Sequence, residues 1–216
     1  MPTPLIVPLS VKSIREIEQD GLEHDLPLML EAGAAAASFL MDRFPPTAAV
    51  LSLVGPGNNG GDALVASSRL VESGYNVQVV MPILDAPLPT DAAAALQAWH
   101  DLEGTEGADL PKVAPDVVID GLFGIGLNRR LESPWQDVID TVNSWKIPVL
   151  SLDIPSGLHA DTGELLGRPV QATWTLAFIA PTRALIEPIS KGYAGRVEVQ
   201  TLGLPYQEPR EDEDFE

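Results

Sequence analysis

The sequence has no cysteine and only three histidines. The absence of cysteine excludes disulfide bonds and thiolate metal sites. The histidines, His24, His100 and His159, lie far apart in the chain. A zinc site is therefore not expected, and each histidine is interpreted as an ordinary surface or packed side chain.

Positive charge is also scarce. The chain has 13 lysines and arginines against 31 acidic residues, for a formal net charge of −18. Residues 208–216 hold six of the acids and one arginine, so −5 belongs to this tail and −13 to the rest. Because nucleic acids and anionic membranes are bound through basic patches, we expect neither as a partner. Any phosphate group should be held by backbone N–H groups and one or two local cations.

Long apolar runs are missing as well. None approaches the ~18 residues of a membrane span, and the N-terminus lacks the charged and apolar regions of a secretion signal. These features predict a cytoplasmic protein. With 45% apolar residues the chain can build one compact domain, and we expect the acidic residues 206–216 to form a disordered tail.

Two helices are expected before the first strand. Ser10 can cap the first, which should end at Gly21. The second should run over about 27–44, carry small residues that allow close packing, and stop at the prolines 45 and 46. The sequence leaves open whether these helices cover the sheet or meet another subunit.

From residue 48 onward, strand-like apolar runs alternate with helical patterns. This order predicts an α/β fold in which a parallel sheet has helices on both faces. The expected strands are 48–54, 77–81, 117–120, 148–153, 173–178 and 195–201, the last of them at an edge. The expected helices between them are 61–74, 91–100 and one opened by a capping box at 133–136 that runs to 145, with a loop over 101–115.

The glycine-rich segment 55–62 follows the first strand. Its glycines allow positive φ and a close approach to a ligand, and the next helix's N-terminus can face an anion. It contains the pattern G-x-G-x-x-G, which alone is weak support for dinucleotide binding. Asp62 either caps the following helix or contacts a ligand, and the paired amides of Asn58 and Asn59 favour ligand or cation contact.

Two more segments begin with an aspartate that ends an apolar strand. In the segment 120–130, Asp120 either braces the loop or belongs to a site. Gly124 and Gly126 leave their backbone N–H groups exposed. The arginines 129 and 130 either contact phosphate or are plain surface charges. In 153–157, a proline and a glycine fix a turn that presents Asp153 and Ser156. Because ligands of open α/β sheets bind at the carboxyl ends of the strands, we expect these loops to meet in one site.

The side chains of Asn59, Asp120 and Ser156 offer oxygen ligands with one formal charge among them. Such a set suits a weakly charged hard cation, completed by backbone carbonyls, better than zinc or a transition metal.

These motifs together resemble the YjeF N-terminal domain family of NAD(P)H-hydrate epimerases. The resemblance covers about residues 11–205. It rests on the segments 28–33, 55–62, 120–127, 153–158, 161–163 (Asp-Thr-Gly) and 203–205.

The resemblance implies a Rossmann-like three-layer αβα sandwich with a mostly parallel sheet and N-terminal helices, occupying residues 1–205. It implies a homodimer that interconverts the R and S forms of hydrated NADH or NADPH, a damaged cofactor. A dehydratase acting on one epimer would be a separate chain. The sequence does not indicate a preference between the NADH and NADPH hydrates.

The resemblance also assigns site residues. Asp153 would bind the substrate and act at the reacting ring, and Asn59, Asp120 and Ser156 would bind potassium. The substrate-binding residues would be Asn58, Asn59, Gly60, Gly61, Asp62, Gly124, Ile125, Gly126, Leu127, Asn128, Arg129, Arg130 and Asp153.

The chain departs from the family pattern at three places and leaves two other interpretations open. Ala63 replaces a usual glycine, Ile125 a common threonine, and 182–183 (Thr-Arg) a frequent lysine. A non-catalytic nucleotide-binding scaffold or protein-interaction module of the same fold should have lost the acid or the cation ligands. An NAD-dependent dehydrogenase should carry an acidic residue near the end of the second strand, where 81–82 is Met-Pro.

Overall fold

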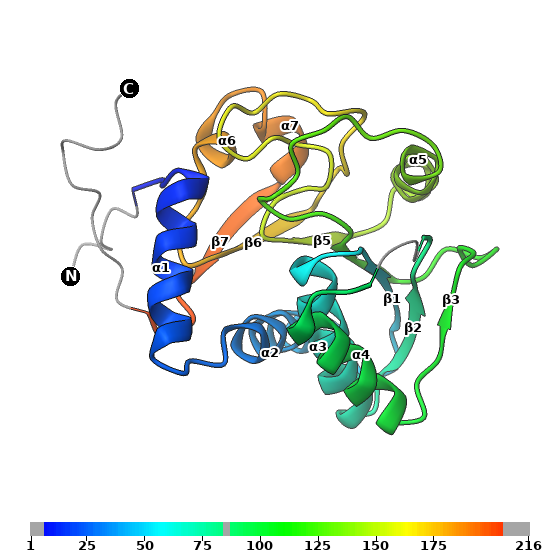
Figure 1. Ribbon diagram of the computed structural model, residues 1–216. Coiled ribbons are helices and arrows are strands. Elements are labelled where there is room, and N and C mark those ends of the chain that lie inside the picture. The colour runs from blue at the N-terminus through cyan, green and yellow to red at the C-terminus, as the bar shows by residue number, and fades with distance from the viewer. Residues whose placement is uncertain (1–6, 84–86, 205–216) are drawn as a thin grey trace.

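A seven-stranded sheet organises the protein. The computed structural model describes residues 7–83 and 87–204 (Figure 1), so the acidic tail lies outside the described residues. The strands are β1 (Ala49–Val54), β2 (Asn76–Val80), β3 (Glu106–Gly107), β4 (Val117–Gly121), β5 (Val149–Leu152), β6 (Trp174–Phe178) and β7 (Arg196–Gln200). The helices are α1 (Val11–Glu23), α2 (Leu28–Met41), α3 (Asn58–Glu72), α4 (Thr90–Asp101), α5 (Trp135–Trp145), α6 (Arg183–Ile186) and α7 (Lys191–Ala194).

The strand order is β3-β2-β1-β4-β5-β6-β7, and every neighbouring pair is parallel. The predicted α/β class is confirmed, and so is the edge position of the last strand. Strand β3 was not predicted, because two exposed residues leave no apolar pattern in the sequence.

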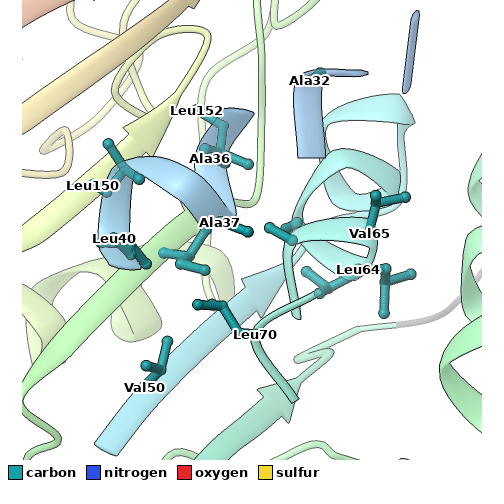
Figure 2. Close-up of a cluster of buried hydrophobic side chains, with 14 of the residues drawn as sticks. Ala32, Ala36, Ala37, Leu40, Val50, Leu64, Val65, Leu70, Leu150 and Leu152 are labelled. Atoms are coloured by element: carbon teal, nitrogen blue, oxygen red, sulfur yellow. The ribbon is translucent and has the colours of Figure 1, made fainter. Parts of the chain in front are cut away.

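Helices cover both faces of the sheet, as predicted. Val50 and Val54 of β1 face the side covered by α2, α3 and α4, whereas Leu51 and Leu53 face the side covered by α5. Figure 2 shows the first side, where alanines and leucines of α2 and α3 meet Val50, Leu150 and Leu152. The predicted close packing of small residues is seen at Gly33 of α2, where a Cβ atom would lie 2.4 Å from the Cβ of Val65 in α3.

Several helix boundaries differ from the prediction, and α2, for example, ends at Met41 rather than near residue 44. Helix α1 does not end at Gly21 but runs on to Glu23. Gly21 is buried, and a Cβ there would lie 3.0 Å from a side-chain methyl of Leu204, so this glycine serves helix packing. Helix α3 begins at Asn58, three residues early, with Gly57 as its N-cap. The capping box before α5 does not form, because the side chain of Gln136 bonds Asp140 and the Arg168 backbone instead.

The first helix is fastened to the far end of the sheet. Its Ser10 cap accepts a bond from the backbone N–H of Ser13, as predicted. Just before it, Leu9 pairs with Thr182 after β6. Within residues 7–83 and 87–204, no helix is long and apolar enough to cross a membrane.

Candidate active site

The strand order reverses direction between β1 and β4. The chain leaves β1 toward β2 and β3, and leaves β4 toward β5, β6 and β7, so the loops after these two strands diverge and open a crevice. A cavity of about 1240 Å³ lies there, lined by parts of α1, α2, α3 and α4 and by the loops that follow β1, β4 and β5.

Glycines let the loops after β1 and β4 touch. The N–H of Gly55 donates to the carbonyl of Gly121 over 3.1 Å. A Cβ on Gly55 would lie 1.7 Å from the carbonyl oxygen of Leu122, and one on Gly60 would lie 2.1 Å from the carbonyl oxygen of Gly55. These glycines therefore serve backbone packing around the crevice, a use that a generic dinucleotide pattern does not require.

Asp62 belongs to the interior of α3, because the helix starts four residues before it. Of the two interpretations of Asp62, helix capping is therefore wrong. Its side chain lines the cavity and is half-buried. Burial raises the pKa of Asp62 well above its usual range, and the negative charge of Asp153 raises it further.

Asn59 is 8% exposed and lines the same cavity. Neither atom of its side-chain amide has a hydrogen-bond partner among the described residues. Buried polar atoms are nearly always paired, because an unpaired one costs about 1–3 kcal/mol. The Asn59 amide is therefore a natural contact for a ligand or ion.

Asp120 is fully buried at the end of β4. Its Oδ1 accepts from the Ser156 hydroxyl at 2.6 Å, and its Oδ2 accepts from the Ser151 hydroxyl at 2.7 Å and from the Ser156 N–H at 3.0 Å. Burial raises the pKa of Asp120, although hydrogen bonds from Ser156, Ser151 and the Leu122 backbone oppose the rise. Asp120 thus braces the loops after β4 and β5.

Ser156 joins the same network to the loop after β4. Its hydroxyl accepts from the N–H of Phe123 over 2.9 Å. The Ser156 hydroxyl also donates to Asp120, so the two side chains that were predicted to share a site are in direct contact.

Asp153 follows β5 with a φ of 67°, which is uncommon for a residue other than glycine. Its Oδ2 accepts a 3.1 Å bond from the N–H of Ile125. Burial is the main cause that raises the pKa of Asp153 to about 6, and the charge of Glu18 adds to it, while the Ile125 bond and Arg15 oppose it. A half-buried carboxyl with such a pKa can both give and take a proton near neutral pH.

Two charged side chains of α1, Arg15 and Glu18, also line the cavity. They form an ion pair of 2.7 Å, and the nearer guanidinium nitrogen of Arg15 would lie 3.4 Å from a Cβ on Gly126. The sequence analysis did not predict that Arg15 and Glu18 line the cavity, because the spacing of apolar residues in α1 predicts only which face of the helix is buried. Charged residues three apart on a helix look like an ordinary solvated pair.

Comparisons with known proteins identify the family of the chain. The family described as YjeF-related protein N-terminus matches residues 25–184. The chain belongs to this family.

Relatives within the YjeF-related family cover most of the chain. The NAD(P)H-hydrate epimerase of Bordetella pertussis (strain CS) is 52% identical over 198 residues, which are 90% of this chain and 87% of that protein. The bifunctional NAD(P)H-hydrate repair enzyme of Leishmania infantum is 38% identical over 183 residues, which are 82% of this chain and 33% of that protein. The crystal structure of yeast ynu0 (YNL200c) has a TM-score of 0.72 at 21% identity, with 83% of both chains covered, and shares the fold.

Most residues that the YjeF-related motifs predicted for the site line the cavity. These are Asn58, Asn59, Asp62, residues 124–129 and Asp153. Gly60 and Gly61 are buried, and Gly61 packs against Met29 of α2. Arg130 is exposed and is not among the described residues that line the cavity.

The departures from the family pattern have local explanations. Ala63 is fully buried, and a Cβ on Gly121 would lie 2.5 Å from its methyl group, so the glycine at 121 makes room for it. Ile125 holds Asp153 through its backbone N–H, which does not depend on the side chain. Arg183 opens α6, whereas the arginines lining the cavity, within the described residues, are Arg15, Arg69 and Arg129.

Proposed function

We propose that this protein interconverts the R and S forms of hydrated NADH and NADPH as an isomerase of nicotinamide-cofactor repair, with Asp153 as its acid/base residue. The isomerase class and the repair role are supported by the similarity to curated NAD(P)H-hydrate epimerases. The role of Asp153 is supported by its position at the cavity, its bond from Ile125 and its pKa of about 6. This carboxyl is the single structural observation that carries the proposal.

Such a group can carry out the proton transfers of the reaction. The hydrated ring carries a hydroxyl and the ring nitrogen on the same carbon. When protonated, Asp153 gives its proton to the departing hydroxyl, and the nitrogen lone pair forms an iminium ion. Water then returns to the ring, and the carboxylate takes up the proton that it releases. While ionised, Asp153 also stabilises the positive charge of the iminium ion.

The rest of the cavity wall can bind the dinucleotide part of the substrate. The exposed loop residues 126, 128 and 129 and the N-terminus of α3 border the cavity, where backbone N–H groups and Arg129 can meet the phosphates. Asn58, Asn59 and Asp62 line the α3 side. The substrate-binding role of all these residues, Gly60, Gly61 and Arg130 included, is part of the proposal.

Potassium fits the neighbouring donors. The unpaired Asn59 amide oxygen, the Asp120 carboxylate and the Ser156 hydroxyl are all oxygen ligands, and together they carry a single formal charge. When bound, the ion would supply positive charge beside the anionic substrate and hold the loops after β4 and β5 together. Within the described residues no cluster of three or more His, Cys, Asp or Glu could hold a metal, so the proposal rests on one carboxylate and two neutral oxygen donors.

Three further features complete the proposal. They are a homodimer, a cytoplasmic location and a dehydratase supplied by a separate chain. The Leishmania infantum relative is a bifunctional repair enzyme, and this chain matches 33% of it. All three features rest on the sequence and the family, and each stays a prediction.

A direct assay tests the function. One resolved epimer is mixed with the protein, and the other is followed by chromatography in potassium and in sodium buffer. We expect interconversion well above the protein-free rate, faster in potassium, and reduced at least ~100-fold by Asp153→Asn. Asp109→Asn, an exposed loop residue, is the matched control and should retain the wild-type rate. Absence of interconversion by the wild-type protein would favour a non-catalytic scaffold.

A further inference from the structure

Asp62 is a second carboxyl group in the cavity, and the reaction as written above does not use it. It projects from α3, whereas Asp153 follows β5. Both side chains line the cavity and both are half-buried. Asp62 does not cap its helix, so local structure does not account for a carboxyl at this position.

The two carboxyls stand on walls that meet at Gly124. A Cβ on Gly124 would lie 2.9 Å from Oδ2 of Asp153 and 3.3 Å from the side chain of Asn59. Asn59 precedes Asp62 by three residues in α3, so the two share one side of that helix. The space beside Gly124 therefore has Asp153 on one side and the α3 wall on the other.

Asn59 independently points to a ligand at this place. It is 8% exposed, it lines the cavity, and both atoms of its amide lack a partner in the described part of the chain. Burying an amide without a hydrogen bond is unfavourable. A molecule seated between the two walls would remove that cost.

The two carboxyls also influence each other. The negative charge of Asp153 raises the pKa of Asp62, in addition to the larger effect of burial. Glu18 raises and Arg15 lowers the pKa of both groups from α1. Because the charge on one carboxyl disfavours the charge on the other, the state with one protonated and one ionised carboxyl is favoured, and one can then act as an acid while the other acts as a base.

The stereochemistry of the reaction provides a role for two carboxyls on opposite walls. The R and S epimers carry their hydroxyl on opposite faces of the ring. A single carboxyl reaches one face, so it serves both epimers only if the ring turns over in the site. Carboxyls on two walls would serve both faces of a ring that stays in place.

We propose that Asp62 is a second catalytic acid/base residue, serving the ring face opposite to the one that Asp153 serves. This inference rests on the epimerisation proposed above. On one face, the protonated carboxyl gives its proton to the hydroxyl as the C–O bond breaks, and the nitrogen lone pair forms the C=N bond. On the other face, water forms the new C–O bond and gives a proton to the ionised carboxyl. One acid ends ionised and the other protonated, and nothing is oxidised or reduced.

The test follows oxygen exchange as well as interconversion. Each resolved epimer is incubated in ¹⁸O-labelled water, and mass spectrometry records the label in the starting epimer and in its product, after subtraction of the protein-free rates. The proteins compared are the wild type, Asp62→Asn, Asp153→Asn and Asp109→Asn as the control. Circular dichroism checks the folding of each variant.

The two variants should give complementary patterns. Asp62→Asn should slow interconversion at least ~100-fold, yet ¹⁸O should still enter the epimer whose hydroxyl faces Asp153. Asp153→Asn should slow interconversion similarly, with label entering only the other epimer. If Asp62→Asn does not fold, Asp62→Glu should slow interconversion much more than it slows exchange in the Asp153-facing epimer.

Other outcomes overturn the inference in distinguishable ways. If the Asp62 variant interconverts the epimers within about threefold of the wild-type rate, or labels both epimers equally, Asp62 is not an acid/base residue although the proposed function stands. If the wild-type protein neither interconverts nor exchanges, the proposed function falls and this inference falls with it.

Discussion

Oδ1 of Asp161 accepts a 2.8 Å hydrogen bond from the backbone N–H of Val11, 150 residues earlier in the chain. Val11 is the first residue of α1, so a carboxylate from the loop after β5 binds an otherwise unpaired donor at the helix N-terminus. The same helix carries Arg15 and Glu18 to the cavity. The Asp-Thr-Gly motif thus ties α1 to the site, a role that the sequence did not reveal.

We expect Asp161→Ala to loosen α1. Loss of the bond to Val11 should cost about 1–2 kcal/mol of unfolding free energy and should raise KM more than it lowers kcat, because Arg15 and Glu18 lose their fixed position. Hydrogen exchange of the α1 amides and steady-state kinetics measure the two effects. Asp161→Asn retains an acceptor oxygen and should behave much closer to the wild type. Equal KM values for the alanine variant and the wild type would show that α1 is held in place by its other contacts.

Asp153→Asn should stabilise the fold above pH 6 while it slows interconversion of the epimers. The pKa of Asp153 is raised to about 6 in the folded protein, above the ~3.9 of an unfolded chain. The folded protein therefore binds this proton more tightly. The stability that the proton confers is complete below about pH 4 and is lost as the pH rises through 6. Asparagine has no proton to lose and tolerates the φ of 67°.

The predicted gain is about 1–2 kcal/mol at pH 8, allowing for solvent screening, and it should vanish near pH 4. Urea unfolding of the variant and the wild type at several pH values measures it, with Asp109→Asn as a control that should show no such trend. A gain that does not change with pH would contradict the assigned cause. The groups that face Asp153 and must stay unchanged are Arg15 and Glu18 of α1, Asp62 of α3, and the backbone of Ile125 and Phe178.

Gly55→Ala should destabilise the protein severely. The new Cβ would lie 1.7 Å from the carbonyl oxygen of Leu122. Because the colliding atoms are backbone and not a flexible side chain, they cannot easily move away. We therefore expect the free energy of unfolding to fall by more than about 3 kcal/mol. Gly192→Ala is the matched control, because a Cβ there meets nothing within 4 Å. It should change stability by about 0.5 kcal/mol or less, or stabilise α7 slightly. Similar urea midpoints for the two variants would refute the packing role of Gly55.

Asn59→Ala should cost little stability in sodium buffer, because its amide has no partner to lose among the described residues. In potassium buffer the wild type should gain about 1.4 kcal/mol when the ion stands tenfold above its Kd, or roughly 3–5 °C in Tm. The variant should lose this gain. Ser190→Ala, which removes another buried unpartnered side chain, should retain it. Equal thermal shifts in all three proteins would remove Asn59 from the proposed potassium site.

The sequence predicted well what local patterns encode. Apolar runs that end in Asp120 and Asp153 predicted two strands and their carboxyl ends. The alternation of strands with helices predicted a parallel sheet, in which these ends share one edge. The candidate site was therefore expected at that edge. The sequence pattern failed at the start of α3, since glycines 60 and 61 each disfavour a helix by about 1 kcal/mol. Tertiary packing requires glycine at both positions, because a Cβ on Gly60 would collide with the Gly55 backbone and one on Gly61 with the Met29 side chain.

The sequence by itself therefore determined the fold class, the edge of the sheet that carries the candidate site and the residue types expected there, because each depends on periodicity and on strand ends. Only the tertiary structure decided that Gly55 serves packing, that the Asn59 amide is left unpaired, that Arg15 and Glu18 reach the cavity and that Asp161 holds α1. The physical reason is distance along the chain. These contacts join segments up to 150 residues apart, and no local spacing encodes which surfaces meet once the sheet has formed.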